Sequence, residues 1–124
     1  MKKKIFAIIL ARGGSKGIKN KNLKKIKDKP LLKWTIDHCK NSKYIDEIWL
    51  SSDSSKILRL GKKSSINIIK RPKKFALDKS SSEEAWLHAI SYIEKKNIIA
   101  CQFHPEKSQE NGLKLIKHFM RKFA

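Results

Sequence analysis

The sequence is short of cysteine and of long apolar runs, and both shortages narrow the class of protein. Its two cysteines, Cys39 and Cys101, lie far apart and belong to no CxxC or Cys/His cluster. This spacing indicates neither a zinc site nor a disulfide framework, and it fits a reduced, cytoplasmic compartment. No apolar stretch is long enough to span a membrane. We therefore expect a cytoplasmic protein without a membrane partner.

Arginine is also scarce, although the chain is strongly basic. The 30 basic residues comprise 26 lysines and 4 arginines against 11 acidic residues, giving a net charge of +19. Such a charge leaves a polyanion-binding protein as one alternative. However, bidentate contacts to base edges mostly use arginine, and the lysines are scattered through every segment. We interpret the charge as a lysine-rich solvated surface and expect no nucleic-acid partner.

The apolar runs predict four strands in a chain that is long enough for one core. They cover residues 5–10, 45–53, 66–69 and 98–101 of the 124. The opening MKKKIFAIILA leads into a glycine-rich loop rather than a small-residue cleavage site, so we interpret it as a buried strand and not a signal peptide.

Helices are predicted between these strands. Pro30 opens the first, and the second is capped by Ser54 or Ser55 and closed by Gly61. The third, in SSSEEAWLHAISYI, begins with a serine-to-glutamate capping box. The residues expected on one face are Leu31, Leu32, Thr35, Ile36 and Cys39 in the first helix, Trp86, Leu87, Ile90 and Ile93 in the third, and Leu113, Leu115, Ile116, Phe119 and Met120 in the last. The alternation predicts an α/β fold with a parallel sheet and right-handed crossovers.

The loop after the first strand carries the strongest chemical signal. ARGGSKGIKNKN, residues 11–22, supplies unhindered backbone N–H groups at its glycines and three cations. The glycines are Gly13, Gly14 and Gly17, and the cations are Arg12, Lys16 and Lys21. Such a loop at the carboxyl end of a strand binds phosphates in α/β sheets, although its spacing is neither a Walker A nor a GxGxxG motif. The residues predict triphosphate binding, with a flexible basic loop as the alternative.

Several motifs in consistent order resemble one family. LARGGSKGIKNKNL, KPLLKWTI, IWLSSD and KRPKKFALDKSSS, within residues 1–95, resemble the N-terminal part of acylneuraminate cytidylyltransferases, or CMP-sialic acid synthetases. The resemblance implies a three-layer nucleotide-diphospho-sugar transferase fold, with CTP and a nonulosonic acid as substrates and Mg2+ as cofactor. The family's metal-holding carboxylates come later than the resembling region, so no metal ligand is assigned in this chain.

The same resemblance assigns site residues position by position. Arg12, Lys16 and Lys21 are the implied catalytic cations, and with Ser15 they match residues that hold the triphosphate. Asn22, Arg71 and Ser82 match residues around the cytidine, and Gly13 and Gly14 belong to the nucleotide-binding loop. In-line attack on the α-phosphate needs positioning and charge neutralisation, which such residues supply.

Local roles remain as alternatives for three polar residues. Asn22 can cap a turn, and Ser82 lies where a helix favours serine. Asp53 ends a strand in a βα unit, where we expect it to cap the next helix rather than to bind a metal.

The end of the chain resembles a different family. NIIACQFHPEKSQENGLKLIKHF, within residues 97–124, resembles the C-terminal end of class I glutamine amidotransferases, most closely the glutaminase subunit of imidazole glycerol phosphate synthase. His104 and Glu106 match the histidine and glutamate of a Cys-His-Glu triad. Cys101 lies only three residues before His104, which is the wrong geometry for the nucleophile, so the pair is interpreted as vestigial.

Two hypotheses follow for the joined chain. The first is a fused or deleted gene product that joins the two parts near Lys96, and the second concerns how the two parts fold together. Residues 1–96 form a CTP-binding part, and residues 97–124 add a strand, turn and helix to the same sheet, giving strand order 3-2-1-4 and placing Gln102 at the nucleotide. We expect a truncated nucleotidyltransferase with little or no synthetase activity. The alternatives are a non-catalytic remnant of an amidotransferase subunit and a basic polyanion-binding protein, and the oligomeric state is left open between monomer and homodimer.

Overall fold

Three parallel strands form the centre of the protein. The computed structural model describes residues 4–14, 17–77 and 82–93. The central sheet has the order β1-β4-β5, and a small antiparallel pair is formed by β2 and β3. The strands are β1 (Phe6–Leu10), β2 (Lys25–Ile26), β3 (Lys29–Pro30), β4 (Glu47–Ser52) and β5 (Asn67–Lys70). The helices are α1 (Leu31–Asn41), α2 (Ser55–Lys63) and α3 (Ser82–Ile93), with 3-10 turns η1 (Lys21–Leu23) and η2 (Lys73–Phe75).

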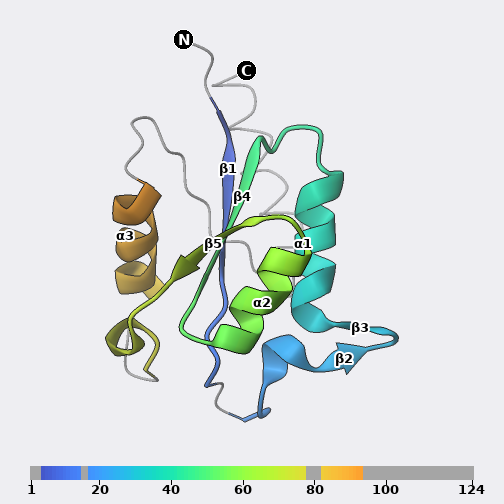
Figure 1. Cartoon of the computed structure of the whole chain (residues 1–124), viewed down its shortest axis with the longest axis vertical. Helices are drawn as coiled ribbons and strands as arrows, with labels where there is room; N and C mark the ends of the chain where they lie inside the picture. The colour runs from blue at the N-terminus through green and yellow to red at the C-terminus, as the bar shows by residue number, and fades with distance from the viewer. Residues whose placement is uncertain (1–3, 15–16, 78–81, 94–124) are drawn as a thin grey trace, which may run out of the picture.

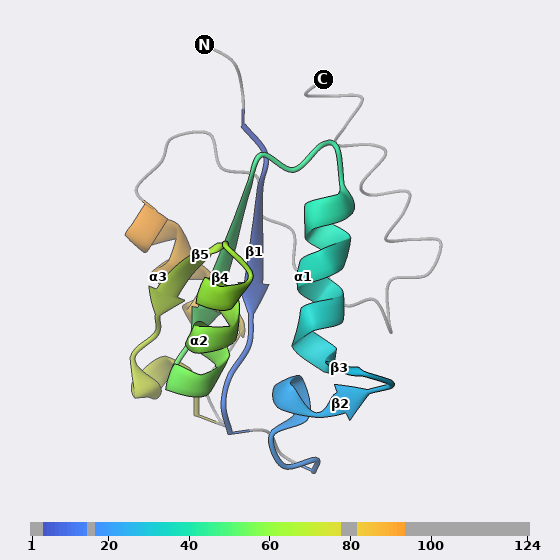
Figure 2. The same ribbon diagram turned by 45° about the vertical axis from the view of Figure 1, so that its right-hand side comes forward.

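The helices cover both faces of this sheet. Figure 1 shows α3 on one face and α1 and α2 on the other, and Figure 2 shows the same division after rotation. This confirms the predicted three-layer α/β fold. It also confirms the 3-2-1 part of the strand order, while the predicted strand at 98–101 lies outside the described residues. No helix in the described ranges is long and apolar enough to cross a bilayer.

Alternating side chains along β1 pack into two separate hydrophobic cores. Phe6 and Ile8 pack with α3, whereas Ile9 and Ala11 belong with α1 and α2. Since successive side chains of a strand point to opposite faces, a strand that is apolar at every position must be covered on both sides. The uninterrupted run FAIIL is therefore the sequence signature of this central position.

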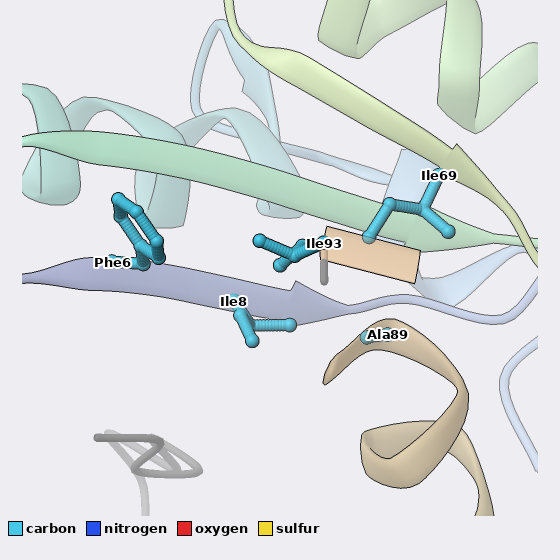
Figure 3. Close-up of a cluster of buried hydrophobic side chains, with 5 residues drawn as sticks. All are labelled: Phe6, Ile8, Ile69, Ala89 and Ile93. Atoms are coloured by element: carbon cyan, nitrogen blue, oxygen red, sulfur yellow. The ribbon is translucent and has the colours of Figure 1, made fainter. Parts of the chain in front are cut away.

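Small residues bring α3 close to the sheet. Its sheet-facing stripe includes Ala85, Ala89 and Ile93, which are nearly inaccessible. Figure 3 shows Ala89 and Ile93 facing Phe6 and Ile8 of β1 and Ile69 of β5. The prediction that Leu87 shares this face is wrong, because Leu87 is 67% exposed. The two alanines define the buried stripe instead.

The prediction that Gly61 ends α2 is wrong, because Gly61 lies inside this helix. A Cβ at Gly61 would come within 2.8 Å of Leu50 Cδ2 and 2.9 Å of Ile68 Cγ2. The glycine is therefore required for close helix–sheet packing. The helix ends two residues later, where Ser64 donates its backbone N–H to Leu60 and Gly61, and Ser65 adopts a positive φ of 59°.

The sequence predicts a loop from Ala11 to about Lys29, but β2 and β3 form a hairpin there that is tied to α1. The Trp34 indole donates to the Ile26 carbonyl at 3.1 Å, and Lys29 Nζ lies 4.0 Å from the Trp34 ring centroid. Asp37 accepts hydrogen bonds from Lys29 and Lys33, each at 2.7 Å. These two ammonium groups hold the pKa of Asp37 at about 2, below its ordinary value of 3.8.

Gly61→Ala is expected to lower the free energy of unfolding by about 1–3 kcal/mol. Alanine is the better helix former, but its methyl group overlaps the buried Leu50 side chain. Urea denaturation measures the change. The exposed neighbour Lys62 supplies the control, because Lys62→Ala alters the same helix without entering the core. Equal stability of wild type and Gly61→Ala would contradict the packing argument.

Asp37→Asn is expected to cost about 0.5–1 kcal/mol at neutral pH, the upper range for a partly exposed charge pair. Because folding lowers the pKa of Asp37, its contribution is present above about pH 4 and is lost as the pH falls toward 2. Thermal melts at pH 7, 4 and 2 should therefore converge for wild type and variant at the lowest pH. Asp28→Asn removes the same charge from the exposed hairpin turn and should leave this pH dependence unchanged.

Candidate functional site

The carboxyl ends of β1, β4 and β5 meet at one edge of the sheet. Figures 1 and 2 show the loop after β1, the η1 turn and the η2 turn at this same end. Backbone pairing continues just past the strands, since Ala11 N–H donates to Ser51 O at 3.0 Å and Arg71 N–H donates to Ser52 O at 2.8 Å. The residues that follow each strand are thereby held next to one another. This edge is where open α/β sheets bind ligands.

Asp53 ties the glycine-rich loop to the end of β4. Its Oδ1 accepts a hydrogen bond from the Gly13 backbone N–H at 2.8 Å. The prediction that Asp53 caps the next helix is wrong: Ser54 is the N-cap residue of α2, and its Oγ accepts from Ile57 N–H at 3.4 Å. The Asp53 carboxylate instead forms a hydrogen bond across the sheet edge, to a residue 40 positions away in the chain.

The glycines of the loop differ in what surrounds them. A Cβ at Gly13 would lie 2.8 Å from the Ser54 Cβ, so the loop can approach the β4–α2 turn only through glycine. The Gly13 N–H is already bonded to Asp53. By contrast, Gly14 has open space at its Cβ position, and Gly17 has an open position with a φ of +91°. Gly13 anchors the loop, whereas Gly14 and Gly17 face open space.

Asn22 holds the same loop from the η1 side. Its Nδ2 donates to the Arg12 carbonyl at 3.2 Å. The carbonyl bond fixes the backbone from which the Arg12 side chain extends. Lys21 is exposed one residue earlier in the same 3-10 turn. Asn22 is thus part of the support of the loop, a role close to the turn-stabilising alternative.

Arg71 is a buried cation with few protein partners. It is 5% exposed, and its Nη1 and Nη2 donate to the carbonyls of Phe75 and Ser51, both at 3.4 Å. These bonds are long compared with the usual 2.9–3.0 Å. Its Nε is buried and has no hydrogen-bond partner among the described residues. A buried donor without a partner costs roughly 1–3 kcal/mol, so a ligand acceptor at this place would be stabilising.

Neighbouring charged groups act on the Arg71 guanidinium in opposite directions. Burial lowers the pKa of its guanidinium, the negative charge of Asp53 raises it, and the positive charge of Arg12 lowers it again. Among the described residues, the guanidinium groups of Arg12 and Arg71 and the carboxylate of Asp53 therefore act on one another at this edge. Since Asp53 also accepts from Gly13, the sheet edge keeps an excess of positive charge, which favours an anionic ligand.

The structure brings together only part of the predicted site. Six of the predicted residues lie at this sheet edge: Arg12, Gly13, Gly14, Lys21, Asn22 and Arg71. Ser82 begins α3, and its side chain is not described. The remaining predicted residues, Ser15, Lys16, Gln102, His104 and Glu106, lie outside the described residues.

The structure also adds two features that the sequence analysis does not predict. Gly13 N–H donates to Asp53, and the buried Ser51 Oγ has no hydrogen-bond partner in the described part of the chain. The sequence signal for the Asp53 contact is its position at a strand end, which also favours a helix-capping role.

The described residues do not form a metal site. They contain no group of three or more His, Cys, Asp or Glu side chains that could hold an ion. Asp53 is engaged with the loop, and burial raises the pKa of the Cys39 thiol, which disfavours the thiolate form that binds metals. No chemical step is therefore assigned to Mg2+ at these residues.

A model of a known protein family matches most of this chain. The sequence model described as "Cytidylyltransferase" matches residues 6–106. This match runs past residue 95, where the predicted resemblance ended, and includes His104 and Glu106. The similarity of the tail to glutamine amidotransferases stays a prediction.

Curated relatives agree with this match. The chain is 40% identical over 91 residues to the N-acylneuraminate cytidylyltransferase of Escherichia coli O18:K1:H7, covering 73% of this chain and 22% of the relative. It is 35% identical over 113 residues to an enzyme of Helicobacter pylori named pseudaminic acid cytidylyltransferase and UDP-2,4-diacetamido-2,4,6-trideoxy-beta-L-altropyranose hydrolase, covering 88% of this chain and 22% of that protein. The chain thus spans about a fifth of the length of these two relatives.

A solved structure supports the fold. A CMP:2-keto-3-deoxy-manno-octonic acid synthetase complexed with CTP superposes with a TM-score of 0.74 at 18% sequence identity, covering 97% of this chain and 48% of that chain. The likeness establishes a nucleotide-sugar transferase type of fold.

Replacing Asp53 tests whether its hydrogen bond anchors the loop. Asp53→Ala removes the acceptor, and we expect the Gly13 amide to exchange at least about tenfold faster, because a hydrogen bond to a charged group is worth about 1.5–3 kcal/mol. Asp53→Asn keeps an Oδ1 acceptor and should retain most of the protection. NMR hydrogen exchange measures both. Unchanged exchange in Asp53→Ala would show that the bond does not hold the loop.

Proposed function

Because the chain belongs to the cytidylyltransferase family, we propose that it binds CTP at the carboxyl end of its parallel sheet, as the nucleotide-binding part of a synthetase that joins CMP to a nonulosonic acid. The names of the relatives support this substrate class, since one acts on N-acylneuraminate and another on pseudaminic acid.

The observation that carries the proposal is the buried guanidinium of Arg71. Its Nε donor is unpaired within the described residues, and its two carbonyl contacts are long. An acceptor-rich ligand would supply the partner that this donor lacks. The loop that contains Gly14 lies at the same edge, so one ligand can contact both regions.

Cytosine has the acceptor pattern that an arginine can recognise. Its O2 and N3 atoms both accept hydrogen bonds, whereas the N3 position of uracil carries a hydrogen and would face the donors of Arg71. A buried donor group discriminates strongly against a ligand that cannot pair with it. Arg71 therefore accounts for a preference for cytidine over uridine nucleotides.

The glycine-rich loop accounts for the phosphates. The open Gly14 backbone and the cations Arg12 and Lys21 are suited to the triphosphate, in line with the resemblance. In the proposed reaction the sugar hydroxyl oxygen gives up its proton to solvent and forms a bond to the α-phosphorus. The bond between the α-phosphorus and the oxygen that bridges to the β-phosphate breaks, and pyrophosphate leaves with that oxygen and its electron pair. These side chains would hold the phosphates in line and offset their charge. Mg2+ remains a prediction for the complete reaction.

Calorimetric titration with CTP, in buffer containing Mg2+, tests the proposal. We expect Arg71→Ala to weaken CTP binding by about 10- to 100-fold and to reduce the preference for CTP over UTP, because a charge-assisted hydrogen bond is lost. Arg12→Ala should weaken CTP and inorganic tripolyphosphate alike, since its proposed contact is to phosphate.

Arg59 provides the matched control. It is exposed on α2, so Arg59→Ala makes the same change of charge away from the sheet edge and should leave CTP affinity within about twofold of wild type. Equal affinity of the wild-type chain for CTP, ATP and heparin would contradict the proposed function and favour general polyanion binding.

A further inference from the structure

Phe75 connects Arg71 with helix α3 through two contacts. Its carbonyl oxygen accepts from Arg71 Nη1 at 3.4 Å. Its ring lies 5.5 Å from the His88 imidazole, centroid to centroid, with 41° between the planes. The contact joins the segment after β5 to α3 without passing through residues 78–81. One residue thus links a candidate ligand donor to a neighbouring helix, through its backbone carbonyl on one side and its half-buried ring on the other.

We propose that Phe75 and His88 form a positioning pair that sets the orientation of Arg71 toward the cytosine base. The inference rests on the proposed CTP site and adds a determinant of base selectivity to it. Neither residue has a ligand-binding role in the family resemblance described above. Both act through Arg71 and do not themselves contact the nucleotide.

The Arg71 guanidinium depends on contacts from other elements for its orientation. Its guanidinium has two long carbonyl contacts, one from Ser51 in the sheet and one from Phe75. Ser51 is fixed by β4, which pairs with strands on both sides. Phe75 lies at the end of η2, a single 3-10 turn closed by the bond from Phe75 N–H to Pro72 O at 3.0 Å. The Phe75 contact is therefore the more adjustable of the two, and the packing of its ring decides where its carbonyl lies.

Helix α3 is packed firmly against the sheet next to His88. Ala89, the residue after His88, is fully buried against the sheet, and Ile93 continues the same contact (Figure 3). Because the Phe75 ring packs on His88, α3 holds this ring in a defined position relative to the sheet. Arg71 is then held from two directions, by β4 directly and by α3 through Phe75.

Packing alone does not account for a histidine at position 88. The Nδ1 atom of His88 is buried and has no hydrogen-bond partner in the described part of the chain. A leucine would fill this place without burying an unpaired nitrogen, so simple packing does not explain the imidazole. A flat ring opposite Phe75 provides a defined aromatic contact, which leucine lacks.

The test compares binding of CTP and tripolyphosphate to the whole chain and four variants. Phe75→Leu and His88→Leu each remove one ring, and we expect CTP affinity to fall about three- to tenfold in each. Tripolyphosphate affinity should not change, because the glycine-rich loop is untouched. The double variant should be no weaker than the weaker single variant, since both changes break one contact. His88→Phe restores a ring and should recover most of the CTP affinity.

Tyr92→Leu is the control on the same helix. Tyr92 is 57% exposed and makes an edge-on contact with Trp49, at 6.4 Å and 68°, on the sheet rather than on η2. It should bind CTP as wild type does. Thermal melts verify that each variant is folded, and a structural role alone would lower the melting temperature without separating CTP from tripolyphosphate.

The outcomes distinguish this inference from the proposed function. If wild type binds CTP, and Phe75→Leu and His88→Leu bind CTP as tightly as wild type does, the positioning role is wrong while the proposed CTP site stands. Parallel loss of CTP and tripolyphosphate affinity would also overturn it, because the effect would then be general. If the wild-type chain does not bind CTP, the proposed function fails, and the positioning role fails with it.

Discussion

The parallel pairing of β1, β4 and β5 determines where the candidate binding residues lie. In this arrangement every strand ends at the same edge of the sheet, so the segments that follow β1, β4 and β5 become neighbours (Figure 2). The two-sided burial of β1 keeps this pairing in place, because α1 and α2 cover one face and α3 the other. Gly61 and Ala89 matter for the same reason: each allows a helix to approach the sheet closely.

At that edge, one carboxylate serves several groups. Asp53 accepts from the Gly13 backbone and lies close enough to Arg71 to favour its charged form, while Arg12 opposes it. The result is a cationic region in which the backbone is fixed but the donors are not all satisfied. Preorganised donors of this kind bind an anion with little reorganisation, which is the physical basis of the proposed CTP site and of the supporting role given to Phe75.

Much of this architecture could be predicted from the sequence, and the errors share one cause. The apolar run of β1 and the alternation of strands and helices gave the correct fold class. Gly61 was expected to end a helix, Leu87 to face the sheet, and Asp53 to cap a helix; all three expectations used the signals of neighbouring residues only. A glycine near a helix end and an acidic residue at a strand end each have a common local role. The sheet overrides both, because close packing and a long-range hydrogen bond are not encoded in local spacing.

By itself, the sequence determined the order of the three central strands and the three helices, the glycines and cations of the loop after β1, and the resemblance to cytidylyltransferases. These follow from periodicity and from motifs that are continuous in the chain. Only the tertiary structure decided which polar groups meet: Asp53 with Gly13, Arg71 with Ser51, and Phe75 with His88. Such contacts depend on the register of parallel strands and on the depth at which each helix docks, and both are set by packing across the whole sheet.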